Sequence, residues 1–456
     1  MPELEPLYTA EEMGAAEAGH DTRALMERAG ALAAEAALQE LREAERWTVV
    51  VGGGANGGDG RIAASHLQAH GKRVRILDAK AGDTDLGEPD AIVDALFGTG
   101  FGGEPRSDAA ALIERINASP ARVFAIDVPS GVDASTGEIP GVAVEADATV
   151  TFHGRKVGVV VAPGRFNAGR VRVADIGLAP GETRHRLVLP ELLRSVPRRS
   201  ERDNKYTAGH VLVVGGSPGM SGAPSLTAGA AMRADAGYVT VAARESVLPV
   251  LEARLVEAVK KPLPEKLGDK AVDVVLELAA KASAVALGPG LGRDEGAHTL
   301  VRRLMTELEL PIVADADALY ELEPADWPGP RVLTPHEGEL GRLLGRTDIS
   351  AHRLAAVQEA AERFGCVVVL KGADTLVAAP GAGVLVAAGG LPSLATAGTG
   401  DVLTGIVAAF LAKGMEPQRA AAAAAAAQQR AAVEAPERAG LVASDLLDAL
   451  PRALDR

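Results

Sequence analysis

The sequence contains only one cysteine among its 456 residues, Cys366. A single thiol excludes an intrachain disulfide and is typical of a protein from a reducing compartment. Cys366 lies in the apolar run FGCVVVLKG, which predicts a buried strand, so we interpret it as a packing residue and not as a nucleophile. The acidic start, MPELEPLYTAEE, lacks an apolar signal segment, and the chain has no apolar run of about 18 residues. We therefore expect a cytoplasmic protein without a membrane partner.

Positive charge is also scarce, with 47 Lys and Arg against 61 Asp and Glu and a net charge of −14. Binding to nucleic acid or to an anionic membrane relies on clustered positive charge, so both are excluded as general partners. An anionic ligand must instead be held by local devices, such as backbone N–H groups at a helix N-terminus or a bound cation.

Aromatic residues make up only 3% of the sequence, whereas hydrophobic residues make up 47%. The cores must then consist mainly of Val, Leu and Ala, which favours layers of helix and sheet. After a long predicted helical stretch over 9–43, helical patterns alternate with strand-like runs, which predicts βαβ units and a mostly parallel sheet. These runs lie at 47–51, 73–77, 91–97, 122–128, 148–152 and 157–161.

The second half predicts a different α/β domain over 208–456, separated from a first domain over 1–180 by a linker over 181–207. The linker segment mixes prolines, arginines and polar residues without a sustained period. The last third of the chain is helical, and we expect its eight consecutive alanines, 420–427, to lie in one tightly packed helix. Two different domains of this class usually carry two sites. The predicted strands of the second domain are HVLVV, YVTVAA, SAVALG, PIVADA, RVLTP, CVVVL, TLVAA and VLVAA.

The loop VGGGANGGDG, residues 51–60, follows a predicted strand and has the G-x-G-x-x-G spacing of a dinucleotide-binding loop. Asp78 follows about 20 residues later, where a ribose-binding acid is expected in a dehydrogenase. Asp59 argues against that assignment, because a bound pyrophosphate prefers N–H groups without a second negative charge. The loop therefore binds either a cofactor or the substrate itself.

Two further motifs follow neighbouring strands, DALFGTGFGGE at 94–104 and AIDVPSGVD at 125–133. Because the carboxyl ends of parallel strands meet at one edge, we expect Asp59, Asp94 and Asp127 to share one crevice with the glycine-rich loops. Three carboxylates beside a phosphate-binding loop require a cation or a protonated carboxyl group. One such aspartate alone would be interpreted as a helix cap, but three of them beside glycine-rich loops predict a ligand-binding site.

Four motifs of the first half resemble, in order, the signature of the NAD(P)HX epimerases, the N-terminal module of the bifunctional NAD(P)HX repair enzymes. The resemblance covers about the first 180 residues and implies a Rossmann-like three-layer domain. It also implies that the dinucleotide is the substrate, a hydrated NADH or NADPH whose two epimers are interconverted. The motifs are LMERAG at 25–30, GGGANGGDG at 52–60, DALFGTG at 94–100 and DVPSG at 127–131.

The resemblance assigns acid/base catalysis at the epimerised carbon to Asp127. It implies K⁺ ligated by Asn56, Asp94 and Ser130, and oxygen ligands suit such a hard cation. The family loop usually has Asn where this chain has Ala55, so a backbone contact is expected there. We interpret Lys156 as a surface lysine. The implied substrate-binding residues are Ala55, Asn56, Gly57, Gly58, Asp59, Gly98, Thr99, Gly100, Phe101, Gly102, Gly103, Glu104 and Asp127.

The second half opens with GGSPG, residues 215–219, which matches the G-x-S-x-G nucleophile elbow of α/β-hydrolases. Ser217, either Asp315 or Asp317, and His336 follow the order of a hydrolase triad. Pro218 argues against hydrolysis, because it leaves no N–H at the position that must donate to an oxyanion.

A later segment, TAGTGDVLTG at 396–405, predicts a helix N-terminus whose N–H groups face an anion. Asp401 at this position repels a bound phosphate, but it is useful if it accepts the proton of a hydroxyl that attacks phosphorus. In isolation it would be interpreted as a first-turn carboxylate. The chain has no G-x-x-x-x-G-K-[ST] loop, so phosphates must be held in this other way.

Five motifs of the second half resemble, in order, the ADP/ATP-dependent NAD(P)HX dehydratases, a branch of the ribokinase-like fold. The match spans about residues 200–456 and implies that Asp401 is the catalytic base. The motifs are KYTAGHVLVVGGSPGMSGA at 205–223, ALGPGLG at 286–292, TPHEGE at 334–339, KGADT at 371–375 and AGTGD at 397–401. The hydrated dinucleotide would contact Ala223, Gly290, His336 and Asp401. The nucleotide would contact Lys371, Gly372, Ala373, Asp374, Thr375 and Gly400.

Together the resemblances imply a bifunctional metabolite-repair enzyme, an isomerase and a lyase. The first domain equilibrates the R and S epimers, and the second regenerates NADH or NADPH from the S form by transferring a phosphoryl group to its ring hydroxyl. K⁺, Mg²⁺, ADP (or ATP) as co-substrate and a homo-oligomeric assembly are expected. Three alternatives remain: a dehydrogenase, a ribokinase-like small-alcohol kinase fused to a dinucleotide-binding domain, and a non-catalytic dinucleotide sensor.

Overall fold

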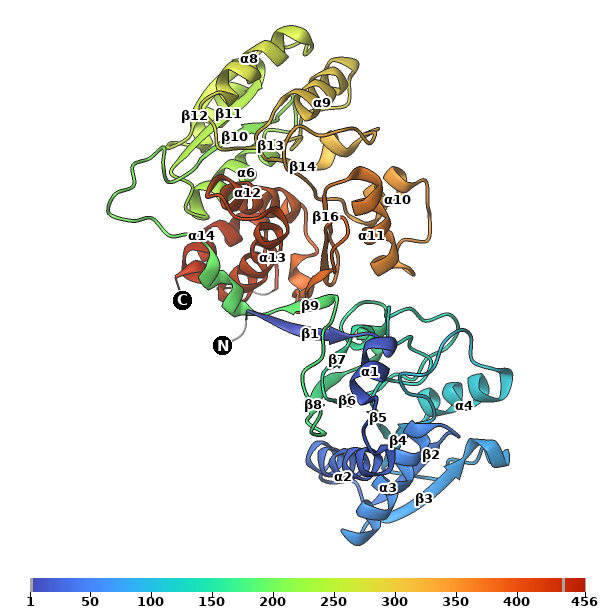
Figure 1. Ribbon diagram of the computed structural model, residues 1–456. Coiled ribbons are helices and arrows are strands. Elements are labelled where there is room, and N and C mark those ends of the chain that lie inside the picture. Colours follow the sequence, from blue (N-terminus) through green and yellow to red (C-terminus); the bar gives the residue numbers. More distant parts are fainter. Residues whose placement is uncertain (1–2, 437–438, 456) are drawn as a thin grey trace. The chain divides into compact units, whose positions relative to one another are not determined.

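The computed structural model describes residues 3–436 and 439–455, which form two compact units (Figure 1). The N-terminal unit contains Pro6–His185 and Ser350–Leu354. Of the described residues, the C-terminal unit contains 3–5, Arg186–Ile349, 355–436 and 439–455. Among the described residues, no helix is both long and apolar enough to cross a membrane.

The N-terminal unit is built on a parallel sheet with the strand order β3-β2-β4-β5-β6-β8. The central strands β4, β5 and β6 are buried almost throughout, as is typical of parallel strands covered on both faces. The strands are β2 (Arg46–Val51), β3 (Arg73–Asp78), β4 (Ala91–Ala95), β5 (Arg122–Ile126), β6 (Ala148–Phe152) and β8 (Arg170–Ala174).

Helices cover both faces of this sheet, because successive strand residues point to opposite sides. Val49 and Val51 pack with α2 (Thr22–Glu40) and α3 (Ala55–Ala69), whereas Val50 packs with α4 (Ser107–Ala118). The three-layer α/β arrangement is the one predicted. Leu7 and Tyr8 of β1 (Leu4–Tyr8) pair with β7 (Arg155–Lys156). The other elements are α1 (Ala10–Glu17), α5 (Gly164–Asn167), η1 (Ala79–Ala81) and η2 (Val157–Val159).

The order in which strands are added reverses at β2. Strand β3 pairs with one edge of β2, and β4 pairs with the other. In open α/β sheets, ligands bind at the carboxyl ends of strands at such a switch point. The glycine-rich segment 52–54 follows β2 and the segment 96–106 follows β4, so both border this crevice.

Three local predictions for the N-terminal unit were wrong. The helical stretch over 9–43 breaks into α1 and α2, because Thr9 and Asp21 cap separate helices. The run 157–161 forms η2 and a turn instead of a strand, and apolar periodicity alone does not distinguish a buried turn from a short strand. Strand β8 was missed because its sequence, RVRVA, carries the arginines typical of a sheet edge.

The C-terminal unit has a longer sheet, in which β12-β11-β10-β13-β14-β15-β16 are parallel. Strands β17 and β18 follow in antiparallel pairing, and β9 pairs with β18. Strand β12 was not predicted, because its sequence VKKPL contains lysine and proline, which are unusual in strands. These residues are tolerated here because β12 is an edge strand. The strands are β9 (His185–Val188), β10 (His210–Val214), β11 (Tyr238–Arg244), β12 (Val259–Leu263), β13 (Ala284–Leu287), β14 (Ile312–Ala314), β15 (Arg331–Leu333), β16 (Val367–Leu370), β17 (Thr375–Ala378) and β18 (Leu385–Ala387).

Four helices, α6, α12, α13 and α14, share one large core with this sheet. Residues 420–427 lie within α13, and most of them are fully buried, which confirms the single packed helix predicted for the alanine run. The helices are α6 (Gly222–Arg233), α7 (Leu248–Arg254), α8 (Asp269–Ala279), α9 (Glu295–Glu307), α10 (Glu337–Leu344), α11 (Arg353–Phe364), α12 (Thr399–Ala412), α13 (Pro417–Glu434) and α14 (Ala443–Leu454), with η3 (Pro190–Ser195), η4 (Glu245–Val247), η5 (Ala316–Leu319) and η6 (Pro392–Leu394).

Part of the segment expected to be a linker, 181–207, is packed into this unit. Strand β9 pairs with β18, and Leu192 and Leu193 of η3 are fully buried in the same core as α13. Residues 197–207 are exposed. The apolar residues of this segment were too few to produce a detectable period, although they are sufficient to fix η3 to the core.

Two candidate active sites

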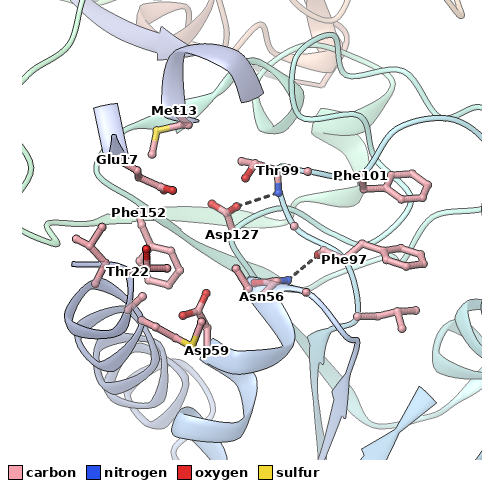
Figure 2. Close-up of a pocket in the computed structure, with 18 of the residues that line it drawn as sticks. Met13, Glu17, Thr22, Asn56, Asp59, Phe97, Thr99, Phe101, Asp127 and Phe152 are labelled. Carbon is pink, nitrogen blue, oxygen red and sulfur yellow. Dashed lines mark hydrogen bonds between the residues drawn. The ribbon is translucent and has the colours of Figure 1, made fainter. Parts of the chain in front are cut away.

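A cavity of about 600 Å³ lies at the carboxyl ends of β2, β4 and β5 in the N-terminal unit (Figure 2). We call it the acidic cavity, because Glu17, Asp59 and Asp127 all line it. Nine of the residues expected to bind substrate line this cavity. They are Ala55, Asn56, Asp59, Gly98, Thr99, Gly100, Phe101, Gly102 and Asp127. Glu104 lines a neighbouring cavity, and Gly57, Gly58 and Gly103 line neither of the two.

Asp127 follows β5 and is held from three sides. Its Oδ1 lies 2.8 Å from Lys156 Nζ and accepts a hydrogen bond of 3.2 Å from Thr151 Oγ1. Its Oδ2 accepts a hydrogen bond of 3.2 Å from the backbone N–H of Thr99. The backbone of Asp127 is left-handed, with φ of 72°, a conformation in which non-glycine residues concentrate at functional sites. The carboxylate is therefore fixed in position and faces the cavity (Figure 2).

Asp59 faces the same cavity from the first turns of α3 (Figure 2). Burial raises its pKa to about 8, and the negative charges of Asp127 and Glu17 act in the same direction. Burial also raises the pKa of Glu17. The negative charge of Asp127 raises this pKa further, whereas the positive charge of Lys156 lowers it. The cavity thus holds a protonated Asp59 at neutral pH beside Asp127, which is paired with Lys156. An acid and a base of this kind can serve proton transfer.

The three residues expected to bind K⁺ lie together beneath this cavity. Asp94 is fully buried and accepts hydrogen bonds from Ser130 N (2.8 Å) and Ser130 Oγ (2.6 Å). Burial raises the pKa of Asp94, although these donors oppose the shift. Asn56 donates from Nδ2 to the carbonyl oxygens of Phe97 (2.6 Å) and Ile126 (3.1 Å), whereas its Oδ1 is buried without a hydrogen-bond partner. An unpartnered buried amide oxygen, on a side chain that contacts the same Phe97 carbonyl as Ser130 does, fits a hard monovalent cation.

The carboxylate of Asp78 does not line the acidic cavity. Its Oδ2 lies 2.6 Å from Arg61 Nη2, and its Oδ1 accepts from the backbone N–H of Lys80 at the start of η1. The resemblance of this position to a ribose-binding acid is therefore explained by a local ion pair and a helix cap.

The prediction that Lys156 is a surface lysine was wrong. Its side chain is only 1% exposed and pairs with Asp127, and Nζ also donates to the carbonyl oxygen of Phe152 at 2.8 Å. The signal was present in the sequence, because the run VGVVV follows directly after Lys156. A lysine among buried apolar residues needs a carboxylate partner. Glu17 and Lys80 were also missed, since neither lies in a recognised motif.

In the C-terminal unit, Asp401 lies in the first turn of α12, as the AGTGD motif predicts. Burial raises its pKa to about 7, and the charge of Asp315 acts in the same direction, whereas Lys371 opposes it. Such a carboxyl group exchanges a proton readily near neutral pH, which suits a general base. The preceding Gly400 packs against the same group of residues, because a Cβ added there would lie 3.2 Å from Lys371 Nζ and 3.8 Å from Asp315 Oδ2.

A buried ion pair stands next to Asp401. Lys371 Nζ lies 2.8 Å from Asp315 Oδ1, and Thr404 Oγ1 donates to Asp315 Oδ2 at 2.7 Å. Burial alone would raise the pKa of Asp315, but Lys371 and these hydrogen bonds lower it below its usual value. Burial alone would lower the pKa of Lys371, but Asp315 and Glu339 raise it. Lys371 therefore carries a positive charge beside the carboxyl group of Asp401.

The other predicted residues of this unit form three groups: His336, the neighbours Ala223 and Gly290, and the KGADT segment. His336 caps α10, and its Nδ1 accepts a hydrogen bond of 3.0 Å from Gly338 N. Its backbone forms an isolated parallel β-bridge with Lys371. A Cβ added at Gly290 would lie 3.3 Å from the Cβ of Ala223, so these two positions adjoin. In the KGADT segment, Gly372 and Ala373 are exposed, Thr375 begins β17, and Asp374 is fully buried.

The residues of the possible hydrolase triad have separate partners. Ser217 Oγ donates to the carbonyl oxygen of Gly290 at 2.9 Å. Asp315 pairs with Lys371, and Asp317 accepts from Arg293 Nε at 2.7 Å. His336 accepts from backbone N–H groups of α10. The structure does not assemble these side chains into a nucleophile, base and orienting acid.

Comparisons with known proteins match both units. A family model described as NAD(P)H-hydrate dehydratase matches residues 211–452, and one described as the YjeF-related protein N-terminus matches residues 22–85 and 77–158. The chain is 38% identical to the bifunctional NAD(P)H-hydrate repair enzyme Nnr of Moorella thermoacetica, over 94% of this chain and 92% of that protein. It is 34% identical to the protein of the same name from Escherichia coli, over 94% of this chain and 89% of that protein.

Solved structures resemble the C-terminal part of the chain. The ADP/ATP-dependent NAD(P)H-hydrate dehydratase of Bacillus subtilis, co-crystallised with ATP and Mg²⁺, matches with a TM-score of 0.52 and 29% identity, over 58% of this chain and 96% of that one. A ribokinase-like superfamily protein of Enterococcus faecalis matches with a TM-score of 0.53 and 24% identity, over 60% of this chain and 97% of that one, which bears on the fold alone. The ribokinase-like fold expected for this part of the chain is confirmed.

Proposed function

This chain belongs to the family of bifunctional NAD(P)H-hydrate repair enzymes, and on that basis we propose which of its side chains carry out the two reactions. The N-terminal unit interconverts R- and S-NAD(P)HX in the acidic cavity, and the C-terminal unit dehydrates S-NAD(P)HX with ADP or ATP at Asp401. One observation carries the proposal. Each unit has a half-buried carboxyl group with a raised pKa next to an aspartate–lysine ion pair.

Epimerisation requires that the ring hydroxyl leave one face of the carbon and return on the other. The protonated carboxyl group of Asp59 donates its proton to that hydroxyl, the C–O bond breaks, and water leaves while the ring nitrogen supplies its electron pair to form a C=N bond. The carboxylate of Asp127 accepts a proton from a water molecule that adds to the opposite face. As the new C–O bond forms, the C=N π electron pair returns to the ring nitrogen, which gives the other epimer, and exchange with solvent returns both carboxyl groups to their initial state.

This role of Asp59 predicts a pH dependence. Because Asp59 must be protonated, epimerase activity should fall as the pH rises through about 8. Asp59→Asn should lower kcat by about 10²-fold or more and remove this fall in activity at high pH, the alkaline limb of the pH profile. The measurement is the rate of epimer interconversion, followed by chromatography of NADHX between pH 6 and 9.5.

Glu17→Gln provides the matched control, because the charges that raise the pKa of Asp59 are those of Asp127 and Glu17. The variant should retain the low-pH rate and shift the limb to lower pH. An unchanged limb in Asp59→Asn would contradict the assignment.

We propose that Asn56, Asp94 and Ser130 hold K⁺, with the carbonyl oxygens of Phe97 and Ile126 nearby. The unpartnered Oδ1 of Asn56 supports this proposal. When bound, the ion would supply positive charge that offsets the carboxylates and the substrate phosphates. Asn56 and Ser130 both contact the backbone of Phe97, so they tie the loop after β4 to α3 and to the segment after β5.

Replacement of K⁺ by choline should lower both epimerase activity and the melting temperature, because an ion that binds the folded state alone stabilises it. We expect a K⁺-dependent rise of a few degrees for wild type and none for Asn56→Ala. Thermal unfolding across a K⁺ titration measures this directly. A rise of equal size in the variant would remove Asn56 from the ligand set.

Dehydration begins when the ring hydroxyl of S-NAD(P)HX attacks the terminal phosphorus of ADP or ATP and Asp401 accepts the hydroxyl proton. AMP or ADP leaves, and phosphate is then expelled from the ring with loss of a proton from the neighbouring carbon, which regenerates the dihydronicotinamide. Lys371 and the N–H groups of the AGTG loop stabilise the transferred phosphoryl group. We expect Mg²⁺ with the nucleotide, as in the Bacillus subtilis relative, and ADP as the preferred donor.

The similarity of the relatives across both units favours repair over a small-alcohol kinase, a dehydrogenase or a sensor. We also propose that the protein is cytoplasmic, because its single cysteine suits a reducing compartment, and that it forms a homo-oligomer, which sizing in solution would test.

A further inference from the structure

A second cavity of about 700 Å³ adjoins the acidic cavity in the N-terminal unit. We call it the α4 cavity, because Ala109, Ala111, Leu112 and Arg115 of α4 line it. The two cavities share a wall, since the same residues line both. The shared residues are Gly53, Lys80, Leu96, Phe97, Phe101 and Gly102.

The shared wall carries an aromatic surface. The rings of Phe97 and Phe101 stack with centroids 4.6 Å apart and an interplanar angle of 15°. Figure 2 shows both rings on the side of the loop away from Asp59. Both side chains are half-buried, and Leu112 adds a buried apolar contact on the α4 side. A surface of this kind binds a flat heterocyclic base by stacking.

The junction of the two cavities carries a positive charge. A Cβ added at Gly53 would lie 1.8 Å from Lys80 Cε and 2.2 Å from Lys80 Nζ, so the ammonium group lies against the glycine-rich loop that begins α3. Lys80 is exposed and forms no ion pair among the residues that the structure describes. An ammonium group and first-turn N–H groups together suit a pyrophosphate.

We propose that the α4 cavity binds the adenosine half of the hydrated dinucleotide, while the hydrated ring occupies the acidic cavity and the pyrophosphate lies across Gly53 beside Lys80. This inference rests on the proposed epimerase function. The charges of the α4 cavity agree with it, because three basic residues (Lys80, Arg106 and Arg115) are matched by three acidic ones (Asp83, Glu104 and Asp108). A neutral cavity with carboxylates suits an adenine base and ribose hydroxyls.

The test compares two substrates, NADHX and hydrated reduced nicotinamide mononucleotide, which lacks the adenosine half. Wild type should use the mononucleotide with a kcat/KM at least about tenfold lower. Ala111→Trp fills the α4 cavity from an exposed helix position, and it should raise KM for NADHX about tenfold while leaving the mononucleotide unaffected. Ala118→Trp is the matched control, because Ala118 is exposed on α4 outside the cavity, and it should change neither substrate.

Equal effects of Ala111→Trp on both substrates, or no effect on NADHX, would overturn the inference. Turnover of the mononucleotide shows that the variant is folded, so a loss confined to NADHX does not result from misfolding. If wild type epimerises neither substrate, the proposed epimerase function fails before the adenosine site is tested.

Discussion

Asp401→Asn is expected to abolish recovery of NADH from NADHX, with a fall in kcat of about 10³-fold. Asn has the same shape as Asp but accepts no proton, so the ring hydroxyl loses its base. In wild type the rate should rise with pH through about 7, because the carboxyl group must be ionised to act, and the variant should lack this rise. The measurement is the return of dihydronicotinamide absorbance from S-NADHX between pH 5.5 and 9.

Two controls separate chemistry from folding and binding. Asp448→Asn changes an exposed carboxylate of the same unit that pairs with Arg233, and it should retain full activity. Thermal unfolding of Asp401→Asn should still respond to ADP with Mg²⁺, because Lys371 and Gly400 remain in place. A variant that keeps more than about a tenth of the wild-type kcat would show that another group removes the proton.

Asp127→Asn has the second largest expected effect, a fall in the rate of epimer interconversion of about 10²- to 10⁴-fold. Asn is chosen because it tolerates the left-handed backbone of this position, where φ is 72°, better than Ala does. Dehydration of pure S-NADHX should be unchanged. With an epimer mixture, recovery of NADH should therefore stop near the S fraction, apart from slow spontaneous interconversion.

The same change leaves the buried Lys156 without its carboxylate partner. Removal of one member of a buried ion pair costs about 3 kcal/mol, so the melting temperature should fall. The double variant Asp127→Asn/Lys156→Met removes both charges and should regain much of this stability without regaining epimerase activity. If the double variant recovers activity together with stability, the role of Asp127 is structural.

The sequence predicted the places of the aspartates proposed to be catalytic, because each follows a buried strand or opens a helix beside glycines. Parallel strands then bring Asp59 and Asp127 to one crevice without further information. The edge strands β8 and β12 could not be predicted in the same way. Their charged residues and proline are stable only because one edge faces solvent.

The electrostatic state of the two sites could not be predicted from the sequence. The pKa of Asp59 is raised by burial and by the charges of Asp127 and Glu17, and the pKa of Asp401 is raised by burial and by the charge of Asp315 at the end of β14. Both effects require burial and distances that linear spacing does not contain. The identity of the partner of Lys156 shows the same limit, because Asp127 lies far from it in the sequence and only the fold brings the two side chains together.

The most direct test of the account is recovery of NADH from an equilibrated mixture of R- and S-NADHX by purified protein with ADP or ATP, Mg²⁺ and K⁺. We expect complete recovery by wild type, rapid recovery limited to the S fraction by Asp127→Asn, and no recovery by Asp401→Asn. If wild type recovers no NADH with either nucleotide, the assignment of dehydration to Asp401 and the Lys371–Asp315 pair is contradicted.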